Sequence, residues 1–451
     1  MRLNAMAGMA VLVLSVGSAQ AQALKFLPGE GEIFTWKSYD GFAAAHDLSG
    51  QTLTITGPWI GPDKDLIESV LAYFEAATGA QVNYSGSDSF EQDIVIAAEA
   101  GSAPNIAVFP QPGLAADMAR RGFLSPLGAD IADWVRANYA AGDSWVDLGT
   151  YANAEGEEQL FGFFYKVDLK SLVWYVPDAF FEMGYEIPET MEDLKALTAT
   201  IVADGGTPWC IGLGSGAATG WPATDWVEDL MLRTQPPVVY DRWVTNEIPF
   251  DDPRVVAAIE EYGWFARNDD FVAGGAQNVA TTDFRESPAG LFTFPPECYM
   301  HRQASFITTF FPEGTELGLD ADFFYFPAYG EQDLGTPVLG AGTLWAITDD
   351  SPAARAFIDF LKTPIAHELW MAQTGFLTPF TGANPGAYGT DILAAQGEIL
   401  TSATTFRFDG SDLMPAEIGA DAFWKAMVSY TSGEAAEKVA RDVQARWRAM
   451  R

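Results

Sequence analysis

The alternation of hydrophobic and polar positions along the chain predicts strands and helices that follow one another. Residues 51–59 (QTLTITGPW) alternate and then reach Gly-Pro, which indicates a strand that ends in a loop. Residues 63–79 (DKDLIESVLAYFEAATG) carry apolar side chains at helical spacing, with Asp63 as the expected N-cap and Gly79 as the stop. The next segment, AQVNYSG, predicts a second strand.

The same alternation continues and indicates the fold class. Residues 89–101 predict a helix, residues 105–109 (NIAVF) a buried strand, and residues 113–122 another helix. Strands that alternate with helices are typical of an α/β protein with a mainly parallel sheet covered on both faces. Ligands of such sheets bind at loops that follow the carboxyl ends of strands, here residues 57–63 and 110–113.

The later half of the chain keeps this pattern. Phe161–Phe180 predicts two apolar strands that flank a short polar step, Lys166 to Lys170. Residues 337–364 resume the strand–turn–helix order, and residues 432–451 predict a C-terminal helix with apolar positions at every fourth residue. No internal repeat or low-complexity tract interrupts the sequence.

The N-terminus predicts a secretory signal peptide over residues 1–23. Arg2 precedes a short apolar run, and small residues permit cleavage after Ala21 or Ala23. That run is too short to span a bilayer, and no later segment is long and apolar enough to do so. The alternative is a buried N-terminal helix. An exported chain of about 430 residues has room for two or three domains.

Composition excludes several function classes. The formal net charge of −36 repels nucleic acid and anionic lipid, which both require basic patches. The three histidines are scattered without the spacing of metal ligands, so no metal is expected. The chain has no Walker or dinucleotide fingerprint, and we expect no cofactor. Cys210 and Cys298 are the only cysteines; an exported chain could join them, or they could be two buried thiols.

Four segments in this order resemble the extracellular solute-binding proteins of bacterial ABC sugar importers, the group that contains maltodextrin-binding protein. Three further segments resemble the alpha-glucoside-binding branch: GEGEIFTWKSYDGFAAAHDLSGQ, FPQPG and GWPATDW. The four family-like segments are VLAYFEAATGAQVNY, AGSAPNIAVFPQPGLAADMARRGFLSPL, PVLGAGTLWAITDDSPAARAFIDFLKTP, and ADAFWKAM with the terminal helix.

The resemblance implies a type II periplasmic binding protein fold, with two discontinuous α/β lobes and a ligand cleft between them. Strands would cross between the lobes near residues 163–167 and 337–342, and hinge closure would bury the ligand. The implied ligand is a glucoside of the sucrose, trehalose, maltose or palatinose kind. The lobes would comprise residues 24–163 with 341–385, and residues 168–337 with 386–451.

A sugar site needs aromatic rings for the apolar faces of the ligand and polar groups for its hydroxyl rim. Three candidates have an alternative structural role: Trp59 could lie in the core, Asp63 could cap a helix, and Gln111 could close its loop by a hydrogen bond. Tyr299 is an alternative ligand contact to Glu297. The candidate ligand contacts are Trp59, Asp63, Lys64, Phe109, Gln111, Trp221, Thr224, Asp225, Glu297, Gly340, Gly342 and Trp424.

The segment GWPATDW separates into two parts. We expect a helix to begin at Asp225 as its cap, with Glu228 completing a capping box. Trp226 then aligns with Leu230 and is expected in the core. Trp221 would precede the helix and lie across a sugar face, with Thr224 and Asp225 offering polar groups to the rim.

The expected function is a periplasmic receptor that delivers an alpha-glucoside to a membrane permease, as a monomer and without catalysis. Two alternatives remain. A polyamine receptor on the same fold would also use tryptophans and carboxylates. A secreted glycoside hydrolase would need a carboxylate pair, such as Asp225/Asp229 or Glu297/Asp322.

Overall fold

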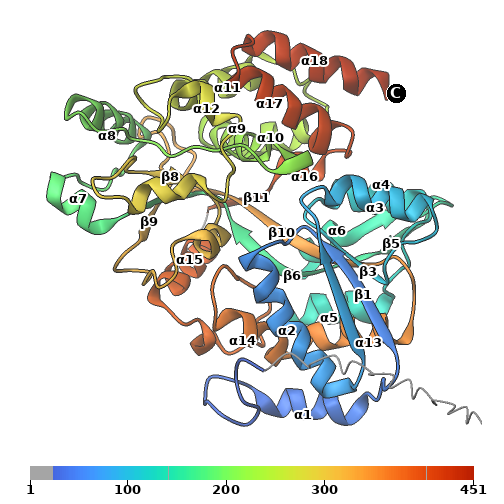
Figure 1. Ribbon diagram of the computed structural model, residues 1–451. Coiled ribbons are helices and arrows are strands. Elements are labelled where there is room, and N and C mark those ends of the chain that lie inside the picture. Colours follow the sequence, from blue (N-terminus) through green and yellow to red (C-terminus); the bar gives the residue numbers. More distant parts are fainter. Residues whose placement is uncertain (1–23, 141, 403, 451) are drawn as a thin grey trace, which may run out of the picture.

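The computed structural model describes residues 24–140, 142–402 and 404–450 and shows two α/β lobes with separate cores (Figure 1). The predicted signal peptide, residues 1–23, lies outside the described residues. Among the helices that are described, none is both long and apolar enough to cross a bilayer.

The chain begins with helices and strands in alternation, as the hydrophobic pattern predicts. In order, these elements are α1 (Trp36–Ala45), β1 (Thr52–Gly57), α2 (Pro62–Thr78), β2 (Gln81–Gly86), α3 (Phe90–Glu99), β3 (Ile106–Phe109), α4 (Pro112–Arg120), α5 (Ala129–Asn138), α6 (Gly142–Gly149), β4 (Thr150–Ala152), β5 (Glu158–Leu160), β6 (Gly162–Leu169) and β7 (Leu172–Tyr175).

The middle of the chain is mostly helical. Its elements are α7 (Pro177–Met183), α8 (Met191–Ala203), η1 (Gly216–Ala218), α9 (Trp221–Thr234), α10 (Pro237–Val244), α11 (Pro253–Ala266), α12 (Ala276–Val279), η2 (Ser287–Phe292), β8 (His301–Arg302), η3 (Ser305–Phe310) and β9 (Asp322–Tyr325).

The last part contributes to both lobes. Its elements are β10 (Pro337–Ile347), α13 (Pro352–Leu361), α14 (Pro364–Met371), η4 (Pro385–Ala387), α15 (Asp391–Ser402), β11 (Thr405–Phe408), α16 (Gly410–Leu413), the π-helical turn η5 (Ile418–Phe423), α17 (Trp424–Thr431) and α18 (Ala436–Ala449).

The main sheet contains both parallel and antiparallel strand pairs. Its strand order is β11-β10-β3-β1-β2, and β6 pairs with β10. Strands β1, β2 and β3 are parallel, as expected, and β10 is parallel to β11, whereas β10 runs antiparallel to both β3 and β6. The prediction of parallel strands is therefore wrong where β10 pairs with β3 and β6, because β10 returns from the other lobe.

Strands β6 and β10 connect the two lobes. Every residue of both strands is buried. Along β10, Leu339 packs in the core of the second lobe and Leu344 in the core of the first. Glycine at position 342 allows close pairing, because a Cβ there would lie 3.0 Å from the Lys166 carbonyl oxygen. The residue boundaries expected for the two lobes stay a prediction.

The core of the second lobe forms around α9. Trp226 is 1 % exposed and packs against Trp209 and Phe265, with ring centroids 5.4 and 5.0 Å away, which confirms its predicted core position. Helices α11, α17 and α18 gather around α9 in Figure 1. Strands β8, β7 and β9 form a small antiparallel sheet in this lobe.

The two cysteines form a disulfide. Cys210 and Cys298 are joined, with their Cα atoms 5.5 Å apart and a sequence separation of 88. Both side chains are almost fully buried. The bond excludes the alternative of two separate thiols, and it ties the segment before η1 to the segment after η2.

Candidate functional site

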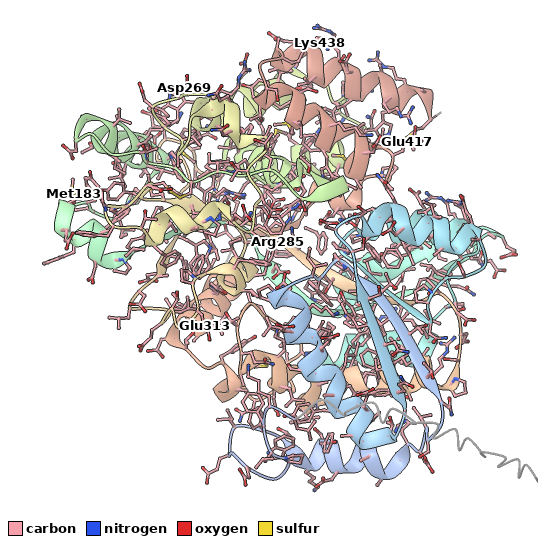
Figure 2. The ribbon with its side chains drawn as sticks, viewed as in Figure 1. Met183, Asp269, Arg285, Glu313, Glu417 and Lys438 are labelled. Atoms are coloured by element: carbon pink, nitrogen blue, oxygen red, sulfur yellow. A yellow bond between two sulfur atoms is a disulfide. The ribbon has the colours of Figure 1, made fainter. Side chains whose placement is uncertain are left out.

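A cavity of about 140 Å³ lies between segments that are far apart in the sequence. Its wall includes the loops after β1 and β3, parts of β6 and β10, and the first residues of α9, α16 and α17. This volume is on the order of ten times what one water molecule needs. In Figure 2, Arg285, which also lines the cavity, lies near the boundary between the two lobes.

Aromatic rings supply much of the apolar wall. Trp221 contacts Phe284 edge to face at 4.9 Å between centroids, and Phe306 lies 6.0 Å away. Trp221 is only partly buried, because part of its indole faces the cavity. Trp59 and Trp424 also line the cavity but are mostly enclosed by protein. The indole of Trp221 is therefore the most accessible of the three.

Two buried lysines form ion pairs at the wall. Lys166 contacts Asp168 at 2.5 Å. Lys170 lies between β6 and β7 and bridges Asp225 on α9, at 2.8 Å, and Asp409 before α16, at 2.5 Å. The ammonium of Lys170 is also 5.3 Å from the ring centroid of Trp221. Lys170 therefore links three segments of the chain: its own between β6 and β7, helix α9, and the residue before α16.

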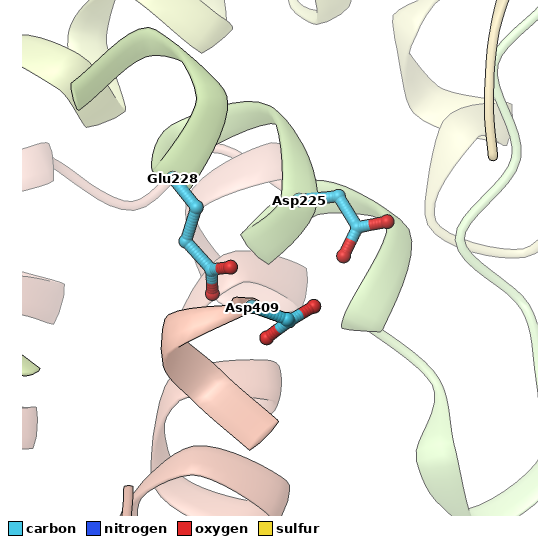
Figure 3. Close-up of side chains that lie close together, drawn as sticks. All are labelled: Asp225, Glu228 and Asp409. Atoms are coloured by element: carbon cyan, nitrogen blue, oxygen red, sulfur yellow. The ribbon is translucent and has the colours of Figure 1, made fainter. Parts of the chain in front are cut away.

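Three carboxylates cluster behind Lys170 (Figure 3). Asp225 and Glu228 project from α9 toward Asp409, and their oxygens lie within 4.8 Å of one another. Glu228 accepts hydrogen bonds of 2.9 Å from the backbone N–H groups of Gly410 and Ser411. Because Lys170 and these N–H groups already bind the cluster, its chemistry is that of a structural anchor, and we assign no metal to it.

The anchor carboxylates differ in their affinity for protons. Burial raises the pKa of Asp225 to about 8, although Lys170 opposes the rise. Burial acts in the same direction on Asp409, but there the ion pair with Lys170 prevails and lowers the pKa to about 2. Asp409 therefore carries the charge that balances Lys170 at neutral pH.

Two further carboxyls of the cavity have pKa values close to neutral pH. Burial raises the pKa of Asp63, on α2, to about 7, with Lys166 opposing and Asp168 adding to the rise. Burial likewise raises the pKa of Glu91, on α3, to about 7. A bound donor or cation would favour their charged forms.

Several buried polar atoms of the cavity wall have no hydrogen-bond partner among the described residues. Gln111 Oε1 is an unmet acceptor, and the ring N–H of Trp424 and the Nε–H of Arg285 are unmet donors. The hydroxyl of Thr343 is unpartnered as well. Unpaired buried groups cost about 1–3 kcal/mol each, so their gathering at one cavity indicates a ligand that carries both donors and acceptors.

Comparison with known proteins identifies the family of the chain. Residues 58–368 match the family described as bacterial extracellular solute-binding protein. The chain belongs to this family. The alpha-glucosides-binding periplasmic protein AglE of Rhizobium meliloti (strain 1021) is 60 % identical over 454 residues, which cover 99 % of each chain.

A second relative supports this assignment, and a solved structure shows the same fold. The osmoprotective compounds-binding protein GgtB of Synechocystis sp. (strain ATCC 27184 / PCC 6803 / Kazusa) is 39 % identical over 401 residues, 89 % of this chain and 93 % of that one. The solved structure of the bacterial solute receptor AcbH aligns with a TM-score of 0.75 at 17 % identity and covers 89 % of this chain and 100 % of that one. The latter similarity confirms the two-lobe α/β fold.

Half of the predicted contact residues lie at the cavity of the solute-binding protein. Asp63 and Gln111 lie on the wall contributed by the first lobe, and Trp221 and Trp424 come from α9 and α17. Placement at a wall does not establish contact with a ligand, so these roles stay predictions. The residues in this group are Trp59, Asp63, Gln111, Trp221, Gly342 and Trp424.

The other six predicted residues lie outside the cavity wall. Lys64 contacts Glu68 at 3.5 Å. Phe109 is fully buried and Glu297 is exposed beyond the cavity. Gly340 faces Phe406, whose ring would be 2.3 Å from an added Cβ.

Thr224 and Asp225 are both buried behind the wall that Trp221 forms. The hydroxyl of Thr224 donates to the Trp221 carbonyl oxygen at 2.9 Å, and Asp225 accepts from Lys170. They therefore support Trp221 from within the protein.

Two predicted helix N-caps are wrong, whereas Gly79 ends α2 as expected. Helix α2 starts at Pro62 after Gly61, so Asp63 lies in the first turn without a capping bond. Helix α9 starts at Trp221 after Gly220, whose φ of 117° favours glycine, so Asp225 is inside the helix and forms no capping box with Glu228. Trp221 is thus the first residue of the helix rather than part of the loop before it.

Sequence reasoning missed several charged residues of the wall. The polar step between two apolar strands was visible, and it contains Lys166, Asp168 and Lys170. Charged residues within a buried apolar stretch must be paired or functional, which would have marked them. Asp409 and Asp412 follow a strand but have no comparable signal in the sequence.

Proposed function

We propose that the protein is the substrate-binding component of an ABC importer and that it binds alpha-glucosides in the cavity between its lobes. The observation that carries the proposal is the combination of aromatic rings with unpartnered polar atoms at one cavity. The full-length similarity to an alpha-glucosides-binding protein supports the choice of ligand class.

The cavity chemistry suits a glucoside. A pyranose ring has apolar C–H faces, which the partly exposed indole of Trp221 would cover, and a rim of hydroxyls that both donate and accept. Gln111 Oε1 would accept from one hydroxyl, and the ring N–H of Trp424 would donate to another. Each such bond removes an unmet group, so ligand binding recovers the cost of leaving that group buried.

The proposed mechanism is a population shift between open and closed lobes. Asp63 and Gln111 come from the first lobe, whereas Trp221 and Trp424 lie on helices of the second. A ligand that contacts both groups stabilises the closed form, and a membrane permease would recognise that form. We propose that the protein acts in the periplasm as a monomer, without a cofactor.

The carboxylate pairs that a hydrolase would require are placed unsuitably for catalysis. Asp229 is fully buried and forms ion pairs with Arg233 and Arg302. Asp225 is held by Lys170, and Glu297 lies away from the cavity. We therefore propose binding without bond cleavage.

The experiment is a titration of intrinsic tryptophan fluorescence with sucrose, trehalose, maltose and spermidine. Trp59, Trp221 and Trp424 line the cavity, so a glucoside should change the emission and saturate it. A response to spermidine alone would refute the glucoside assignment. Release of p-nitrophenol from p-nitrophenyl α-glucoside by the pure protein would refute the assignment as a non-catalytic receptor.

A further inference from the structure

The cations that line the cavity all form ion pairs, whereas several of its carboxyls do not. Lys166 is paired with Asp168, Lys170 bridges two carboxylates, and Arg285 lies 3.5 Å from Asp283. All three cations of the wall therefore already have a carboxylate partner. Of these cations, Arg285 keeps an Nε–H without an acceptor among the described residues.

The carboxylates of the wall exceed these cations. Six aspartates and glutamates line the cavity, and two of them, Asp168 and Asp409, form ion pairs with the lysines. The other four form no ion pair with any residue that the structure describes. They are Asp63, Asp88, Glu91 and Asp412.

Three of these four carboxyls are withdrawn from solvent. Asp63 and Asp412 are 9 % and 6 % exposed, and Glu91 is partly buried. Burial and then Asp409 raise the pKa of Asp412, and Glu91 adds to the rise. Glu91 lies on α3 of the first lobe and Asp412 on α16, so carboxyls from two separate segments line the same cavity.

A further acceptor points to the kind of ligand. Gln111 is 5 % exposed, lines the same cavity, and its Oε1 has no partner among the described residues. The Gln111 oxygen and the carboxyls without an ion pair together offer more hydrogen-bond acceptors than the wall has donors without a partner. An ammonium group offers up to three donors and one positive charge.

We propose that the cavity prefers glucosides that carry an ammonium group, namely amino sugars and imino sugars, over neutral glucosides. The proposal rests on the proposed function, because the sugar ring would still lie against Trp221. The ammonium would bind between Glu91 and Asp412, where it stabilises the charged form of both carboxyls. A linear polyamine would satisfy these charges but would not cover the indole face.

The test compares matched ligands by isothermal titration calorimetry at pH 7. One pair is trehalose and 6-amino-6-deoxytrehalose; the other is maltose and 6-amino-6-deoxymaltose. An alkyl ammonium is charged at this pH. We expect at least one amino analogue to bind about tenfold tighter than its parent sugar, since charge-assisted hydrogen bonds are about twice as strong as neutral ones.

Single substitutions test which carboxyls cause the preference for the amino analogue. Glu91→Gln and Asp412→Asn, tested separately, should each reduce the preference for the amino analogue by about tenfold while the neutral sugar changes less. Glu99→Gln is the matched control: Glu99 lies on the same helix, is exposed and pairs with Arg121 away from the cavity. It should leave both affinities unchanged. Circular dichroism verifies that each variant is folded.

The outcomes separate this proposal from the proposed function. If trehalose or maltose binds and neither amino analogue binds more tightly, the ammonium preference is wrong and the glucoside receptor stands. An amino preference that survives both carboxyl variants also overturns the proposal, because the charge would then lie elsewhere. If neither sugar nor amino sugar binds, both proposals fail.

Discussion

Replacement of Trp221 by alanine should weaken glucoside binding with little loss of stability. The indole starts α9, faces the cavity and packs on Phe284 and Phe306. Its helix keeps the Gly220 cap and the proline of the first turn in the variant. The change therefore removes a ligand platform without removing what sets the helix in place.

The magnitude follows from the area that the indole offers. A sugar ring that covers about half of a tryptophan side chain buries roughly 80 Å² of it. At about 25 cal/mol per Å², this contributes about 2 kcal/mol, which is about a 30-fold change in Kd. The lost ring contacts with Phe284 and Phe306 should lower the melting temperature by about 2–4 °C for each kcal/mol that they contribute.

The assay is calorimetric titration of wild type and Trp221→Ala, with thermal unfolding of both. Trp264→Ala is the matched control, because Trp264 is also a partly buried tryptophan of the second lobe but lies outside the cavity wall. It should lower the melting temperature similarly and leave Kd unchanged. Unfolding of Trp221→Ala at 25 °C, or a Kd within twofold of wild type, would refute the reasoning.

Three further changes test the charges and the disulfide. Burial raises the pKa of Asp63 to about 7, so its contribution to stability is present at pH 4 and lost as pH rises to 7. At pH 8 the free energy of unfolding of ligand-free Asp63→Asn should therefore exceed that of wild type by up to about 4 kcal/mol. Differential scanning fluorimetry should show a higher melting temperature for the variant at pH 8 and equal melting temperatures at pH 4. Lys170→Met leaves buried carboxylates without their cation and should cost about 3–5 kcal/mol in urea unfolding, whereas the exposed Lys425→Met should cost less than 1 kcal/mol. Joint replacement of Cys210 and Cys298 by serine should lower stability by about 2–5 kcal/mol, with Kd for a glucoside within twofold, because neither cysteine lines the cavity.

The hydrophobic pattern predicted the elements of the first lobe well. Strands β1 to β3 and helices α2 to α4 alternate in regular units, so each short stretch carries its own signal. The direction of β10 was not predictable in this way. It depends on which lobe the chain returns from, and the residues within a strand look the same in either direction.

The site was predicted in part, for a similar reason. Aromatic residues beside glycine or proline, such as Trp59 and Trp221, are visible locally and do line the cavity. The partner of Asp225 was not visible, because Lys170 lies 55 residues away and only the fold brings the two together. The start of α9 was misjudged because Gly220 caps it through its backbone, without the side-chain oxygen that a sequence motif shows.

The most direct test of the central claim is isothermal titration calorimetry of the exported form of the chain with sucrose, trehalose and maltose. The account predicts saturable binding of at least one of these glucosides with a stoichiometry of one per chain, weakened about 30-fold in Trp221→Ala. No heat of binding from any of the three at millimolar concentration, with the protein folded, would contradict it.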